Sequence, residues 1–111
     1  MQQVPEVTPT EFAARWPLAS KPAGACLLDV REAHELALAR IDGAVHIPMN
    51  EVPLRVGELE RTDTLVVMCH GGARSMRVAG FLLAQGFERV FNLRGGIDAW
   101  SREVDSSIPR Y

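Results

Sequence analysis

The sequence predicts an α/β domain: a mainly parallel sheet of about five short strands with helices on both faces. Short apolar runs alternate with helical patterns, turn residues separate them, and 47% of the 111 residues are hydrophobic. A chain of this length and composition builds one core. Strands that alternate with helices form parallel sheets covered on both sides. We therefore expect a single domain over residues 1–111.

The first expected element is a short helix near the start of the chain. Thr8 suits the N-cap, Pro9 suits the first helical position, and Glu11 completes a capping box. Residues 12–16 would form the body of this helix. The stretch "SKPAGA" at residues 20–25 has the composition of a loop.

Apolar runs then predict strands, and the segments after them predict helices. Runs rich in apolar and β-branched residues suit buried strands, and they lie at residues 26–30, 44–47, 65–68 and 90–93. The expected helices lie at residues 32–39, 51–59, 75–85 and 97–102. Gly57 weakens the second of these helices, and Gly86 ends the third. Ligands of parallel sheets bind beyond the carboxyl ends of strands, and Cys69 follows such an end.

Charge and hydropathy exclude several classes of protein. A net charge of -2 and a pI near 5.9 give no basis for nucleic-acid binding. No stretch approaches the roughly 18 apolar residues of a membrane span, and the start lacks a secretory pattern, so we expect a cytoplasmic protein with no membrane partner. Residues 69–102 carry five arginines against two acidic residues. This half of the chain suits a small anion.

The cysteines and histidines do not form a metal-binding pattern. Cys26 and Cys69 make neither a C-x-x-C pair nor a four-ligand zinc set. Counting leaves a disulfide open, but a reducing compartment favours two independent thiols. His34 and His46 are expected to lie on the surface or to have structural roles, and we expect no metal.

Residues 66–77, "VVMCHGGARSMR", place Cys69 between an apolar run and a helix. Gly71 and Gly72 lack a Cβ, so the backbone can adopt left-handed conformations and turn N–H groups inward as an anion-binding nest. The helix dipole and the charge of Arg74 add to this effect. Each influence favours the thiolate, the nucleophilic form, so we expect a Cys69 pKa below the free value of about 8.5.

Other interpretations of this segment are weaker. A buried inert thiol is the alternative for Cys69, but two glycines and an arginine are a costly way to build a plain core turn. Cys26 lacks such a loop, so we expect it to pack in the core. His70 stays open as a general base, because adjacency in sequence does not place its ring on the sulfur. A nucleotide-binding P-loop would need lysine where Arg74 precedes Ser75, and an N–H-rich thiolate loop suits anions better than the peptides of a cysteine protease.

Three segments carry motifs of one family. "LLDVREAHELALARIDGAVHIP" at 27–48 resembles D-x-R-x-x-x-E-[FY] followed by a G-[AH]-I and [NH]-[IL]-P pattern. "CHGGARS" at 69–75 resembles C-x-x-G-x-R-[SA], and "LRGGIDAW" at 93–100 resembles L-x-G-G-x-x-A-W. The chain thus resembles the single-domain rhodaneses, which are thiosulfate sulfurtransferases, over about residues 6–102. Leu36 replaces a common aromatic residue, and "ARIDGAVHIP" is a compressed form of the usual run.

The resemblance implies a rhodanese-like fold and a sulfur-transfer mechanism without metal or organic cofactor. Cys69 would attack the outer sulfur of thiosulfate or a related persulfide donor, become a persulfide, and pass the sulfur to cyanide or a thiol. Arg74 would bind the donor anion or brace the loop, and Asp29 and Arg31 would support the loop through hydrogen bonds and ion pairs. The residues expected to bind the sulfur are His70, Gly71, Gly72, Ala73, Arg74 and Ser75.

Two alternatives remain for a domain of this family. The related dual-specificity phosphatases have five residues between cysteine and arginine, and here four residues separate Cys69 from Arg74. The smaller ring implies sulfur rather than phosphate or arsenate chemistry. Domains that lack the cysteine serve as binding modules, which the presence of Cys69 argues against. The expected partners are a small anionic sulfur donor, a thiol or cyanide acceptor, and a partner protein's cysteine in a sulfur relay.

Overall fold

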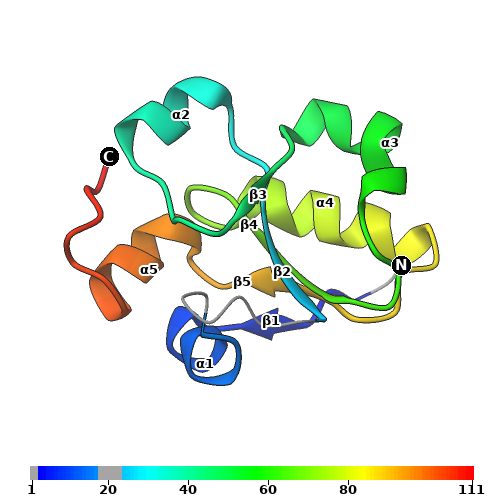
Figure 1. Cartoon of the computed structure of the whole chain (residues 1–111), viewed down its shortest axis with the longest axis horizontal. Helices are drawn as coiled ribbons and strands as arrows, with labels where there is room; N and C mark the ends of the chain where they lie inside the picture. Colours follow the sequence, from blue (N-terminus) through cyan, green and yellow to red (C-terminus); the bar gives the residue numbers. More distant parts are fainter. Residues whose placement is uncertain (1–2, 18–23) are drawn as a thin grey trace.

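The computed structural model describes residues 3–17 and 24–111. Their strands form one five-stranded parallel sheet in the order β1-β5-β4-β2-β3. The strands are β1 (Glu6–Val7), β2 (Ala25–Asp29), β3 (Val45–His46), β4 (Thr64–Met68) and β5 (Val90–Leu93). The predicted fold class is confirmed, and Figure 1 shows helices on either side of the sheet.

The apolar side chains of the strands alternate between two cores. Leu65 and Val67 of β4 pack with helices α3 (Val52–Arg55) and α4 (Ala73–Ala84) on one face. Val66 and Met68 pack on the other face, where α1 (Pro9–Arg15) and α5 (Gly96–Glu103) lie. Successive strand residues point to opposite faces, so a strand with apolar residues at every position must be covered twice.

The predicted strands match the structure within one residue at each end, with one omission. β1 was not predicted, because a two-residue strand carries no alternation of its own. Glu6 and Val7 are extended because they pair with Asn92 and Leu93 of β5 at the edge of the sheet. The pairing of two distant segments, and not a local preference, creates this strand.

The N-terminal helix prediction is confirmed in detail. The Thr8 side chain accepts a hydrogen bond from the Glu11 N–H at 3.1 Å, and the Glu11 carboxylate accepts one from the Thr8 N–H at 2.8 Å. Pro9 occupies the first turn. Most of the predicted "SKPAGA" loop lies outside the described residues.

The remaining helices differ from the prediction mainly at their ends. The expected helix at 51–59 is broken into a 3-10 turn (Met49–Glu51), the single turn α3 and a second 3-10 turn (Val56–Glu58). α2 (Ala33–Leu38) lies within the expected 32–39, and α5 extends one residue beyond the expected 97–102 at each end. α4 begins at Ala73, two residues earlier than predicted. Within the described ranges, no helix is long and apolar enough to cross a membrane.

Candidate active site

Cys69 lies directly after β4, at the carboxyl end of the sheet and before the first turn of α4. It is 1% exposed. Gly72 caps α4 with a φ of 115°, a conformation that favours glycine. Gly71 has no positive φ, and a Cβ there would meet open space, so the predicted need for a left-handed glycine applies to Gly72 and not to Gly71.

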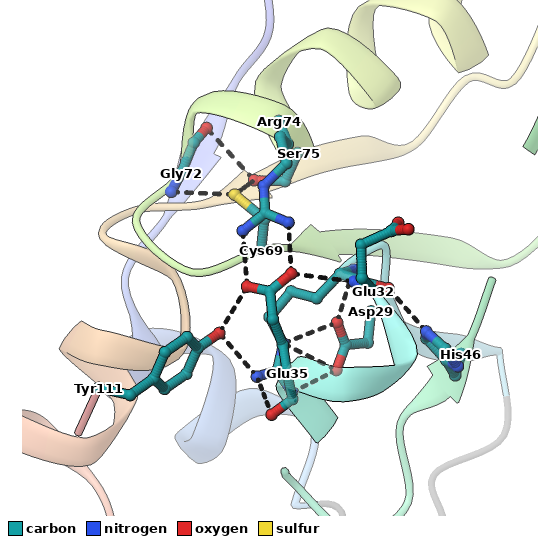
Figure 2. A network of polar contacts seen from close by, with 10 residues as sticks. Asp29, Glu32, Glu35, His46, Cys69, Gly72, Arg74, Ser75 and Tyr111 are labelled. Carbon is teal, nitrogen blue, oxygen red and sulfur yellow. Dashed lines mark hydrogen bonds and ion pairs between the residues drawn. The ribbon is translucent and has the colours of Figure 1, made fainter. Parts of the chain in front are cut away.

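A backbone N–H of the loop donates to the sulfur, and a hydroxyl group lies beside it (Figure 2). The Gly72 N–H donates to Cys69 Sγ at 3.1 Å, and Ser75 Oγ lies 3.3 Å from the same atom. Ser75 is fully buried. Because Gly72 and Ser75 lie at the positive end of the α4 dipole, the sulfur faces a region that stabilises negative charge.

Asn92 of β5 holds the Ser75 hydroxyl, which also lies next to the Cys69 sulfur. Its Oδ1 is in a short hydrogen bond with Ser75 Oγ, and its Nδ2 donates to Glu6 Oε2 at 2.9 Å and to the Gly72 carbonyl at 3.3 Å. Asn92 is 1% exposed. A buried amide with all its polar atoms engaged holds one orientation, so the Ser75 hydroxyl is fixed next to the sulfur.

The first N–H groups of α5 hold the active-site loop by donating hydrogen bonds to the loop's carbonyl groups. The N–H of Ile97 donates to the Cys69 carbonyl at 2.9 Å, and the N–H of Asp98 donates to the His70 carbonyl at 3.2 Å. Gly96 has a φ of 61°, and a Cβ there would collide with both carbonyl oxygens. The glycine pair of "LRGGIDAW" thus allows helix α5 to contact the backbone of the loop.

Arg74 is paired with Glu35 of α2. The two side chains form a bidentate ion pair with N–O distances of 2.6 and 2.9 Å, and Glu35 is buried. The hydrogen bonds from Arg74 outweigh burial and lower the pKa of Glu35 to about 2, with help from the Glu32 N–H and the Tyr111 hydroxyl. The arginine therefore stays charged next to the loop and is fixed in direction.

Asp29 and Arg31 form a second, buried ion pair close to Arg74 and Glu35. Arg31 is fully buried, and its guanidinium makes hydrogen bonds of 2.8 to 3.2 Å with both carboxylate oxygens of Asp29. Between them in the chain, the Val30 N–H donates to the Met68 carbonyl at 3.0 Å, one residue before Cys69. His46 Nε2 donates to the Arg31 carbonyl at 2.7 Å, so this histidine has a structural contact.

His70 has its ring against Tyr111 and not against the nucleophile. The two rings are stacked with centroids 4.1 Å apart and an interplanar angle of 12°. Among the contacts recorded for the described residues, none joins the His70 ring to Cys69 Sγ. The arrangement gives His70 an aromatic neighbour in place of a proton-transfer partner.

Cys26 lies far from this site. It pairs with Leu65 in the register of β2 and β4, whereas Cys69 follows four residues later. At about 3.3 Å per residue the separation is about 13 Å, beyond the roughly 7 Å that a disulfide spans, and both thiols are free. Burial, with a contribution from the Asp63 carboxylate, raises the pKa of Cys26 to about 11. Cys26 is therefore a neutral thiol that packs against the core.

The loop and its support were predicted, but some partners were not. The motif D-x-R-x-x-x-E contains Glu35 together with Asp29 and Arg31, and this signal was present without a role being assigned. Asn92 is the polar residue of an otherwise apolar strand, which is a weaker signal. Tyr111 carried no signal in the sequence.

The chain belongs to the rhodanese-like domain family, whose sequence model matches residues 10–103. A sulfurtransferase of Allochromatium vinosum is 42% identical over 76 residues, which cover 68% of this chain and 71% of that protein. The thiosulfate sulfurtransferase GlpE of Actinobacillus pleuropneumoniae serotype 7 is 35% identical over 79 residues, 71% of this chain and 73% of GlpE. The predicted family is confirmed.

Solved structures agree with the fold. A rhodanese-like domain protein of Staphylococcus aureus has a TM-score of 0.80 and 26% identity, and the alignment covers 97% of this chain and 99% of that one. The family match and the names of these relatives assign the chain to the sulfurtransferases.

Proposed function

We propose that this chain moves sulfane sulfur from thiosulfate, or a related persulfide donor, to cyanide or a thiol acceptor through a persulfide on Cys69. The carrying observation is the hydrogen bond from the Gly72 N–H to Cys69 Sγ at 3.1 Å. A backbone N–H at a helix start is a donor suited to a negatively charged ligand atom. The name of the relative GlpE supports thiosulfate as donor.

The first half-reaction is a displacement at sulfur. The Cys69 thiolate attacks the outer sulfur of thiosulfate, the S–S bond of the donor breaks, and sulfite leaves with the bonding electron pair. The product is a Cys69 persulfide, and no external oxidant or reductant is needed. The Gly72 N–H is placed to stabilise charge on the Cys69 sulfur while the bond forms. The Ser75 hydroxyl lies beside the sulfur and donates its hydrogen to Asn92 Oδ1.

The second half-reaction returns the enzyme to its starting state. An acceptor nucleophile attacks the outer sulfur of the persulfide, and Cys69 leaves as a thiolate. Cyanide yields thiocyanate, and a thiolate yields the acceptor persulfide. A partner protein's cysteine can take the same place in a sulfur relay.

Arg74 has a bracing role in this proposal. Its guanidinium donates two parallel hydrogen bonds to the Glu35 carboxylate, and its side chain is 31% exposed. The ion pair with the ionised Glu35 carboxylate fixes the direction of the Arg74 side chain beside the loop. The four-residue gap between Cys69 and Arg74 supports sulfur over phosphate as the group that is transferred.

Mass spectrometry of the intact chain tests the proposal. After incubation with thiosulfate, the Cys69 peptide should gain the mass of one sulfur atom, and cyanide should remove it and release thiocyanate. Cys69→Ser should abolish both steps, and Cys26→Ser is the matched control that should keep most of the activity. An unmodified Cys69 under a panel of excess sulfane-sulfur donors would contradict the proposed function.

A further inference from the structure

The segment after α5 brings Tyr111 to the active-site loop. The family match ends at residue 103, and the following residues run from α5 to the neighbourhood of α2 (Figure 1). Ile108 is 9% exposed, and its carbonyl accepts a hydrogen bond from Ser101 Oγ at 2.6 Å. Arg110 pairs with Asp98 at 2.8 Å. Two independent contacts with α5 therefore anchor this segment.

Tyr111 contacts residues around the active-site loop through both its hydroxyl and its ring, and Figure 2 shows the hydroxyl next to Glu35. Its hydroxyl accepts a hydrogen bond from Arg31 at 2.9 Å and donates one to Glu35 Oε1 at 2.9 Å. Its ring stacks on His70, the residue after the nucleophile. Burial raises the pKa of Tyr111, so the phenol remains a neutral donor near neutral pH.

The ring and the hydroxyl have different consequences. The hydroxyl completes the set of donors around Glu35, which already receives two hydrogen bonds from Arg74. The ring stacks on the His70 side chain, which belongs to the active-site loop, and the residue Tyr111 is 37% exposed. Because Cys69 is almost fully buried, the groups that flank its loop restrict which molecules reach the sulfur.

We propose that Tyr111 is a specificity-determining residue for the sulfur acceptor, because its ring, stacked on His70, shields the persulfide from bulky thiols and leaves it open to small nucleophiles. This inference rests on the proposed function. The affected step is attack of an acceptor thiolate or cyanide on the outer sulfur, with cleavage of the S–S bond and departure of the Cys69 thiolate. Persulfide formation from thiosulfate, a small donor, is not shielded to the same degree.

Single-turnover transfer from the loaded enzyme tests this role. The full chain is loaded with thiosulfate, freed of donor, and mixed with either cyanide or glutathione, and the ratio of the two rate constants is the readout. Tyr111→Ala should shift the ratio toward glutathione about tenfold, the effect expected from a change of side-chain size in a binding wall. Tyr111→Phe keeps the ring and should keep the wild-type ratio.

The outcomes separate this role from a structural one and from failure of the proposed function. Circular dichroism and urea unfolding verify that the variants are folded, and Tyr111→Leu replaces the alanine variant if that one unfolds. An unchanged ratio in the folded alanine or leucine variant overturns the inference alone. An equal shift in Tyr111→Phe also overturns it, since the hydroxyl would then be responsible. A wild-type Cys69 that takes no persulfide overturns the proposed function and this inference together.

Discussion

Glu35→Gln is the substitution that isolates the ion pair under the active-site loop. Glutamine has the shape of glutamate without its charge, and its NH2 group donates where a carboxylate oxygen accepted, so the variant removes the charge together with the hydrogen bonds to that oxygen. The carboxylate is held by two hydrogen bonds from Arg74, one from Tyr111 and one from the Glu32 N–H. We expect the variant to be destabilised at neutral pH and to lose its fixed Arg74.

The magnitude follows from the pKa of Glu35. A folded-state pKa of about 2, against the ordinary value of 4.5, corresponds to about 3 kcal/mol of stability near neutral pH. Because the folded pKa is the lower one, this stability is present above the unfolded value and is lost as the pH falls toward about 2. The contribution near pH 3 is about 1 kcal/mol.

Urea unfolding of both chains measures this effect. The difference in unfolding free energy between wild type and Glu35→Gln should shrink by about 2 kcal/mol between about pH 7 and about pH 3. Other carboxyl groups titrate in both proteins and cancel. Glu58→Gln, at the exposed pair with Arg55, is the matched control and should change little. A difference that stays the same at both pH values would refute the role given to the Glu35 charge.

Two further substitutions test the contact with α5 and the role of the second cysteine. Gly96→Ala should lower sulfur transfer on the order of a hundredfold and destabilise the fold by about 2 to 4 kcal/mol, because the added Cβ collides with the Cys69 and His70 carbonyls. Gly57→Ala is the control, since a Cβ at Gly57 meets open space. Equal sulfur-transfer activity in the two variants would contradict the close contact between Gly96 and the loop. Iodoacetamide should leave Cys26 unmodified in the folded chain near neutral pH, because its pKa is about 11; peptide mass spectrometry reads this out, and rapid alkylation of Cys26 would refute it.

Local patterns predicted the elements that carry their own signal. The run at residues 65–68 is apolar at every position, and the structure buries all of β4 between the two cores. The Thr8 capping box is likewise complete within four residues. The strand β1 was missed because its pairing with β5 decides it. The helix expected after β3 is broken because its packing on α4 decides its shape.

The site was predictable as a loop but not as a network. Cys69, Gly72 and Ser75 are close in sequence, and their motif placed them together. Arg74 and Glu35 are 39 positions apart, and Tyr111 and Arg31 are 80 apart. No local preference of a tyrosine at the end of the described segment indicates such partners, since only the packed fold brings them into contact.

The four-residue gap and the glutamate of α2 belong to one geometric arrangement. Arg74 is the second residue of α4, and its side chain there extends toward Glu35 (Figure 2). Each residue turns an α-helix by about 100°, so one more residue in the loop would direct the arginine away from α2 or shift the start of the helix. In the present loop, the same short segment places Arg74 opposite Glu35 and sets the Gly72 N–H and the Ser75 hydroxyl next to the Cys69 sulfur. The four-residue spacing between Cys69 and Arg74 and the ion pair between Arg74 and Glu35 are thus parts of one geometry.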